Sequence, residues 1–183
     1  GYTDFLQLVQ LGIPNVVALS GTALANKHAA QIRKFASKVY LAYDGDDAGI
    51  NATLRAGYVL LQAGVEPLII EVPPNQDPDN WVRNEGIGPF QEAMGAGISL
   101  LLFHLKKKEV RNLSGTDRSQ LVQDILGEVA GISDGIIRDD ILKLLAQELQ
   151  VDEIEIIRLF KQKSRRKRRS TPSSKQTALN KSM

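Results

Sequence analysis

The sequence predicts an α/β fold, with a mostly parallel sheet covered by helices on both faces, followed by a small all-α subdomain. Two observations predict it. Through residue 85, amphipathic segments alternate with short apolar runs, which is typical of strand–helix–strand units in a parallel sheet. From residue 86 the strand-like runs stop, and the remaining segments have helical periodicity. We therefore expect an α/β domain at 1–85, a helical subdomain at 86–163 and a basic, disordered linker or tail at 164–183.

The first elements have clear local signals. Residues 3–11 are amphipathic and are followed by Gly12, which predicts a helix that ends at this glycine. The apolar run at 15–19 predicts a short buried strand. A turn follows, and Thr22 is placed to cap a helix that continues through about residue 35.

The next strands frame a longer helix. Residues 38–43 predict a strand, and the helix after it begins at Asp46 or Asp47 and ends at Gly64. Residues 66–72 predict a further strand, which two prolines stop. The helical subdomain is then predicted as four helices, at 98–108, 117–130, 134–149 and 152–163.

Charge is divided unevenly along the chain. Residues 1–160 hold all 21 acidic and 14 of the 23 basic residues, a balance of −7, and the remaining nine basic residues follow. There is no cysteine, which excludes disulfides and thiolate zinc sites, so we expect no zinc in this segment. No apolar run approaches the roughly 18 residues that a membrane span needs. These features fit a reducing compartment, and no membrane partner is expected.

A first acidic loop, Asp44-Gly45-Asp46, follows a predicted strand directly. Ligands of open α/β sheets bind beyond the carboxyl ends of strands, and Gly45 permits a tight turn that lets two carboxylates converge. The alternative is that Asp46 or Asp47 only caps the next helix. Capping explains one aspartate, but it leaves Asp44 at the strand end unexplained.

A second acidic loop, with Asp77 and Asp79, follows the next strand. Pro78 disfavours helix for Asp77, so we expect both carboxylates in extended geometry and on the same sheet edge as Asp44. A polar turn is the alternative reading of this loop alone. Two acidic loops on one edge need a cation, and aspartate oxygens without His or Cys suit Mg²⁺ or Mn²⁺.

Basic residues are concentrated at 161–169, where seven of nine positions are Lys or Arg. This run could contact nucleic-acid phosphates, with Lys163, Arg165 and Arg166 as candidates, or form a solvated linker between domains. The sequence favours neither phosphate contact nor a solvated linker for this run. His28 and His104 stand alone on predicted helices and are interpreted as surface or packing residues.

Several motifs together resemble a known family. GYTDFLQLVQLGIPNVVALSGTAL, VYLAYDGDDAG, ATLRAG and NQDPDNWVRNEG occur in the order and spacing of the Toprim domain of bacterial replicative primases of the DnaG type. IIRDDILKLLAQELQVDEIEIIRLF resembles the helical subdomain that ends their polymerase core. The resemblance covers about residues 1–163 and implies a Toprim fold.

The resemblance also implies roles for the acidic residues. Asp44 would be a ligand shared by two metal ions and Asp46 a ligand of one, so both would be catalytic. Asp77 and Asp79 match the second acidic motif, which supports metal or nucleotide binding, and Asp4 matches an acidic position that lines the same site. The implied metal is Mg²⁺ or Mn²⁺, with two ions.

The implied activity is the synthesis of short RNA primers for DNA replication. Ribonucleoside triphosphates would be joined on a single-stranded DNA template by nucleotidyl transfer. In the family a catalytic glutamate precedes the motif that matches Gly1 to Asp4, and a zinc-binding and a basic subdomain lie upstream. A helicase-binding domain is expected downstream, outside this chain. Residues 1–160 have a net charge of −7 and so offer little positive surface to hold DNA. We therefore expect the chain alone to be inactive in primer synthesis.

Three alternatives remain at this point. Other Toprim proteins, namely topoisomerases and OLD-type nucleases, use a similar acidic cluster to cleave strands. A non-catalytic Toprim module that binds DNA or partners is the third. The tyrosines offer no clear topoisomerase nucleophile, because none lies in a loop that suggests this role.

Overall fold

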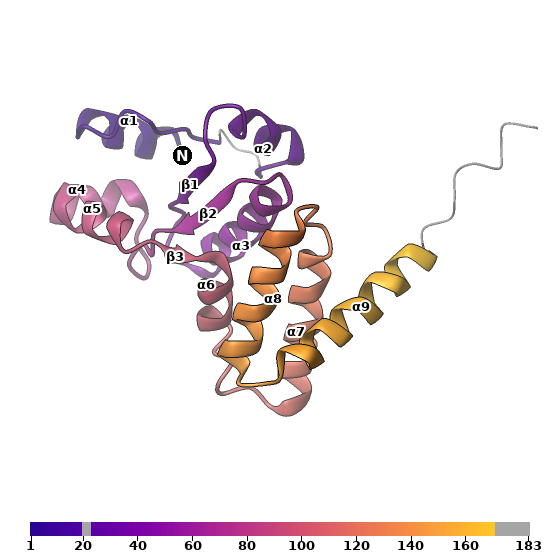
Figure 1. Cartoon of the computed structure of the whole chain (residues 1–183). Coiled ribbons are helices and arrows are strands. Elements are labelled where there is room, and N and C mark those ends of the chain that lie inside the picture. Colours follow the sequence, from indigo (N-terminus) through magenta and orange to yellow (C-terminus); the bar gives the residue numbers. More distant parts are fainter. Residues whose placement is uncertain (20–22, 171–183) are drawn as a thin grey trace, which may run out of the picture.

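The computed structural model describes residues 1–19 and 23–170, which form a small sheet with flanking helices and a bundle of longer helices beside it (Figure 1). The strands are β1 (Lys38–Leu41), β2 (Glu66–Ile69) and β3 (Ile98–Ser99). The helices are α1 (Tyr2–Gln10), α2 (Asn26–Ile32), α3 (Asp47–Gln62), α4 (Pro78–Glu85), α5 (Ile87–Gly95), α6 (Leu100–Lys107), α7 (Gly115–Val129), α8 (Gly135–Leu149) and α9 (Glu153–Ser170).

The sheet has the order β1-β2-β3. β1 and β2 are parallel, with Tyr40 opposite Leu68, and α3 makes the crossover between them. β3 is antiparallel to β2, with Ile69 opposite Ile98. The expectation that strands stop from residue 86 is therefore wrong. A strand of two residues is too short to show the period-2 pattern on which the prediction relied.

Helices cover both faces of the sheet, as predicted. Ile69 packs in one apolar cluster with α2, α3 and α6, while the next residue, Ile70, packs in another with α1, α4 and α5. Successive side chains in an extended segment point to opposite faces of the sheet. Ile69 therefore packs against the helices on one face, and Ile70 packs against those on the other.

The segment at 15–19 does not form the predicted strand. It is irregular, and Val17 is 74% exposed. Apolar composition alone does not make a strand, because its backbone groups need a paired neighbour, and the described sheet begins at β1. The helix predicted through residue 35 is shorter, at Asn26–Ile32. Its predicted cap, Thr22, lies outside the described residues.

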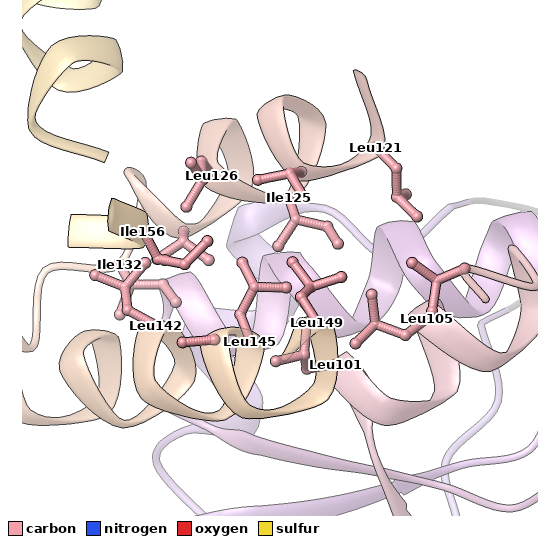
Figure 2. Packing of buried hydrophobic residues seen from close by; sticks show 14 residues of the cluster. Leu101, Leu105, Leu121, Ile125, Leu126, Ile132, Leu142, Leu145, Leu149 and Ile156 are labelled. Atoms are coloured by element: carbon pink, nitrogen blue, oxygen red, sulfur yellow. The ribbon is translucent and has the colours of Figure 1, made fainter. Parts of the chain in front are cut away.

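The long helices share one apolar core. Ile125, Leu126 and Leu145 are fully buried between α7 and α8, and Ile156 of α9 closes one end, where Figure 2 shows it beside Leu142. The helix predicted at 134–149 is confirmed as α8, and Asp134 is its N-cap. Periodicity sufficed here because each helix buries one continuous apolar stripe.

α9 continues beyond its predicted end. It is helical through Ser170, so the expectation of disorder from Ser164 is wrong for residues 164–170. Lys and Arg have good helix propensity, and a helix already nucleated by packing extends at little cost. Residues 171–183 of the predicted tail lie outside the described part of the chain. In the part that is described, no helix is long and apolar enough to cross a membrane.

His104 of α6 is a packing residue, as predicted. Its Nδ1 lies 2.9 Å from the Tyr58 hydroxyl of α3, and both side chains are buried. Burial lowers the pKa of His104 to about 4, and the neighbouring Lys108 acts in the same direction. Burial also raises the pKa of Tyr58 above its ordinary value. The neutral pair thus joins α3 to α6. On α2, His28 accepts a hydrogen bond from the Ala25 backbone.

Candidate acidic site at the sheet edge

The first acidic loop links β1 to α3. Asp46 has extended backbone and caps α3, with its Oδ1 accepting a hydrogen bond from the Gly49 amide at 2.7 Å. The predicted helix start is confirmed. Asp44 and Asp46 are both exposed, and within residues 1–19 and 23–170 the Asp44 carboxylate has no hydrogen-bond partner. Capping uses one oxygen of Asp46 and leaves the other available to a ligand.

Two glycines let the backbone close up around this loop. A Cβ on Gly45 would lie 2.0 Å from the Pro73 carbonyl oxygen, and one on Gly49 would lie 2.1 Å from the Asp44 carbonyl oxygen. No side chain fits at either position without moving the backbone. The sequence predicted that Gly45 permits a tight turn. The structure adds the reason, which is the approach of the second loop.

The two acidic loops are hydrogen-bonded to each other. The Gly45 amide donates to the Gln76 carbonyl at 2.8 Å, and the Asn75 amide donates to the Gly45 carbonyl at 3.2 Å. Asn75 has a left-handed backbone, with φ of 60°, which Asn tolerates better than most residues. The predicted proximity of the loops is therefore present, and it is created by backbone contacts.

Asp77 and Asp79 differ in local structure. Asp77 is extended and caps α4, with Oδ1 accepting from the Asn80 amide at 2.7 Å. Asp79 is helical, so the expectation that both are extended is wrong for this residue. Pro78 occupies the first turn of α4, where its missing N–H costs nothing, and the helix begins there. Asp79 also accepts a hydrogen bond from the Arg83 side chain at 2.7 Å.

Asp4 reaches the second loop from α1. Its Oδ1 accepts a hydrogen bond from the Asp79 amide at 3.1 Å, and its other oxygen pairs with the amino group of Gly1. The Asp4 side chain is only 15% exposed. Residues 75 positions apart in the chain thus meet at one acidic edge.

A basic residue that the sequence did not single out, Lys107, lies beside Asp44. Lys107 and Asp44 line the same small cavity, of about 20 Å³, together with Glu71. Glu71 pairs with Lys106 at 2.5 Å and with Lys107 at 3.0 Å. Burial raises the pKa of Glu71, but the two lysines outweigh it, so this pKa lies below its ordinary value. A carboxylate inside an apolar strand run, EPLIIEV, was the available signal.

The donor set fits a hard divalent cation in part. Asp44 and Asp46 offer exposed carboxylate oxygens from one tight turn, the chemistry that Mg²⁺ and Mn²⁺ prefer. Asp77 and Asp79 already hold hydrogen bonds with Asn80 and Arg83. Within residues 1–19 and 23–170, no three Asp, Glu or His side chains are grouped closely enough to hold a metal ion.

Two family models match this chain, one over the α/β part and one over the helical part. A family model described as Toprim-like matches residues 1–82, and one described as the DnaB-helicase binding domain of primase matches 107–153. The DNA primase of Clostridium acetobutylicum is 32% identical over 162 residues, which are 87% of this chain and 27% of that protein. The DNA primase of Listeria monocytogenes is 30% identical, over 97% of this chain and 28% of that protein.

A solved structure agrees with these relatives. That of the Aquifex aeolicus primase, comprising zinc-binding and RNA polymerase domains, superposes with a TM-score of 0.71 at 34% identity, over 85% of this chain and 37% of that one. The chain matches about half of the catalytic core of bacterial DnaG-type primases. The family predicted from the sequence motifs and the Toprim fold are both confirmed, and the topoisomerase, nuclease and non-catalytic alternatives are not favoured.

The same matches show how much of a primase this chain covers and where the helicase-binding match lies. The chain spans about a quarter of the length of the DNA primases that it resembles. The helicase-binding domain was expected outside the chain, whereas the family model with that description matches residues 107–153 within it. That expectation is corrected. The sequence offered no signal for it, because a helical periodicity identifies a helix and not its partner.

Proposed function

We propose that this chain is the metal-binding part of a primase active site. In this role it acts in the synthesis of short RNA primers from ribonucleoside triphosphates on a single-stranded DNA template. The observation that carries the proposal is the pair of hydrogen bonds that lock the Asp44–Asp46 loop against the 75–77 turn. They bring the acidic motifs of two successive strand ends to one edge, which is where open α/β sheets bind ligands.

The residues have different roles in this proposal. Asp44 and Asp46 are the catalytic metal ligands, because they are exposed and each has a free oxygen. Asp77, Asp79 and Asp4 complete the acidic edge, and Asp77 or Asp79 becomes a ligand by exchanging its present partner. When bound, two Mg²⁺ or Mn²⁺ ions would neutralise phosphate charge and activate the attacking 3′-hydroxyl. The protein's own contribution is to fix the carboxylates before substrate arrives.

The proposed partners follow from the matched relatives. One solved relative is the DnaG primase catalytic domain bound to ssDNA, with a TM-score of 0.73 at 26% identity over 85% of this chain and 51% of that one. This supports a single-stranded DNA template. The match at residues 107–153 supports a replicative helicase as partner, contacted through α7 and α8. The proposed location is the cytoplasm, at the replication fork.

A Mn²⁺ titration, followed by the loss of the free-ion electron paramagnetic resonance signal, tests the site. Asp44→Asn and Asp46→Asn should each weaken Mn²⁺ binding at least about tenfold, because each removes a charged ligand. Asparagine is as good an N-cap as aspartate, so Asp46→Asn removes the charge and keeps the cap on α3.

The matched control is Asp139→Asn on α8, whose side chain is 78% exposed. It loses the same charge on the surface of the bundle and should bind Mn²⁺ as the unchanged chain does. Equal Mn²⁺ affinity in all four proteins would contradict the proposed metal site.

A further inference from the structure

The second half of α9 carries the most concentrated positive charge in the chain. From Lys161 to Ser170 the helix contains seven basic residues, no acidic residue and no large apolar residue. We propose that this basic arm, residues 161–170, binds the phosphate backbone of nucleic acid. The acidic site lies on other elements, so the proposal stands apart from the metal chemistry.

The arm has a fixed base. Ile156 is 2% exposed in the bundle core, and Phe160 packs against the same cluster with the Arg138 guanidinium 5.7 Å from its ring centroid. One turn further, the Lys163 stem passes over Gly127 of α7, where an added Cβ would lie 3.2 Å from the Lys163 Cε. Figure 1 shows the end of α9 standing clear of α7 and α8. The arm is thus a directed extension of the bundle.

The charges at the base of the arm are not neutralised within the described chain. Lys161 and Arg165 are exposed, and neither they nor Lys163 has an ion-pair partner among the described residues. Lys161 and Arg165 are four residues apart in a helix, and like charges at this spacing repel. A bound polyanion would relieve this repulsion.

The distribution of charge favours a phosphate backbone over other anionic surfaces. At about 100° per residue, Lys163 lies about 160° around the helix from both Lys161 and Arg165, so these three residues do not share one face. A membrane-surface helix needs an apolar face opposite its charges, and this segment has none. Charges on more than one side of the helix suit a flexible strand, which can follow them with affinity from counterion release and no sequence preference.

Fluorescence anisotropy with a labelled 20-nucleotide oligomer tests the arm on the whole chain. Lys161→Gln/Lys163→Gln/Arg165→Gln should weaken binding by about 100-fold at 0.1 M salt. It should also reduce the slope of log K against log salt by about 2, because each phosphate contact to a single strand contributes about 0.7 to that slope. Glutamine keeps helix propensity, so α9 should persist.

The control is Lys27→Gln/Lys34→Gln/Lys143→Gln, which removes three exposed lysines elsewhere and changes the net charge equally. It should lose much less affinity than the arm variant. Parallel titrations with DNA and RNA oligomers of the same sequence identify the source of the phosphates. Tighter binding of DNA indicates the template, and tighter binding of RNA indicates the primer. Either result supports the proposal.

Two results would overturn it. One is an equal loss of affinity in the arm variant and the control, which would indicate a general charge effect. The other is tighter binding of poly-glutamate than of either nucleic acid, which would assign the arm to an acidic protein. The oligomer titrations are run in EDTA, without divalent metal ions, so a failed metal site and a failed arm are distinguishable.

Discussion

The acidic sheet edge and the helical bundle are held together in different ways. At the edge, two loops meet through backbone hydrogen bonds and a glycine with no room for a side chain, and the carboxylates stay exposed. In the bundle, apolar side chains such as Ile125 and Leu145 are fully buried (Figure 2). The comparison teaches that stability is concentrated in the bundle, while the edge is built for precise placement of charge. Three predictions test this difference.

The largest effect is expected in the bundle core. Leu145→Ala should lower the free energy of unfolding by about 4 kcal/mol, because it removes a fully buried side chain and leaves a cavity between α7 and α8. Urea unfolding followed by circular dichroism measures this. Ile136→Ala on the same helix removes a side chain that is 77% exposed and should change stability by less than about 0.5 kcal/mol. Similar losses in both would contradict the assignment of stability to the core.

A pH-dependent effect is expected where the two regions join. His104 has a pKa of about 4 in the folded protein and about 6.5 when unfolded, so the unfolded state binds more protons between these values. Stability from this residue is therefore complete above pH 6.5 and is lost as the pH falls toward 4, by up to about 3 kcal/mol. Urea midpoints measured from pH 7.5 to pH 4 test this.

The control for that experiment is His104→Leu, which cannot titrate. It should flatten the fall in stability between pH 6.5 and pH 4, even if it is less stable at every pH because Tyr58 loses its hydrogen-bond partner. An unchanged pH profile in this variant would assign the fall to other groups.

The smallest effect on stability, with the largest effect on the site, is expected at the edge. Gly45→Ala should cost about 2 kcal/mol, because its Cβ would force the Pro73 carbonyl away and separate the two loops. Mn²⁺ affinity should fall at least about tenfold in protein that is still folded. Gly88→Ala and Gly115→Ala add a methyl group where no atom lies within 4 Å, and they should keep both stability and Mn²⁺ binding. Unchanged Mn²⁺ binding in Gly45→Ala would show that the loop contact does not position the carboxylates.

Several features could be predicted from the sequence because their causes are local. α3 begins after Asp46 because an aspartate there caps the helix, and α8 begins after Asp134 for the same reason. The motifs around Asp44 and Asp77 sufficed to identify the family. The failures have longer-range causes: β3 exists through pairing with β2, and the run at 15–19 lacks the pairing that would make it a strand.

The sequence by itself determined the α/β order, the apolar stripes of the bundle, the acidic motifs and the basic run. These follow from periodicity, capping and composition, which act within a few residues. Only the tertiary structure decided that Gly45 meets Pro73, that Asp4 contacts Asp79, that Glu71 and Lys107 flank Asp44, and that α9 carries the basic run as a helix. The physical reason is that each of these contacts joins segments whose proximity depends on how the sheet and helices pack.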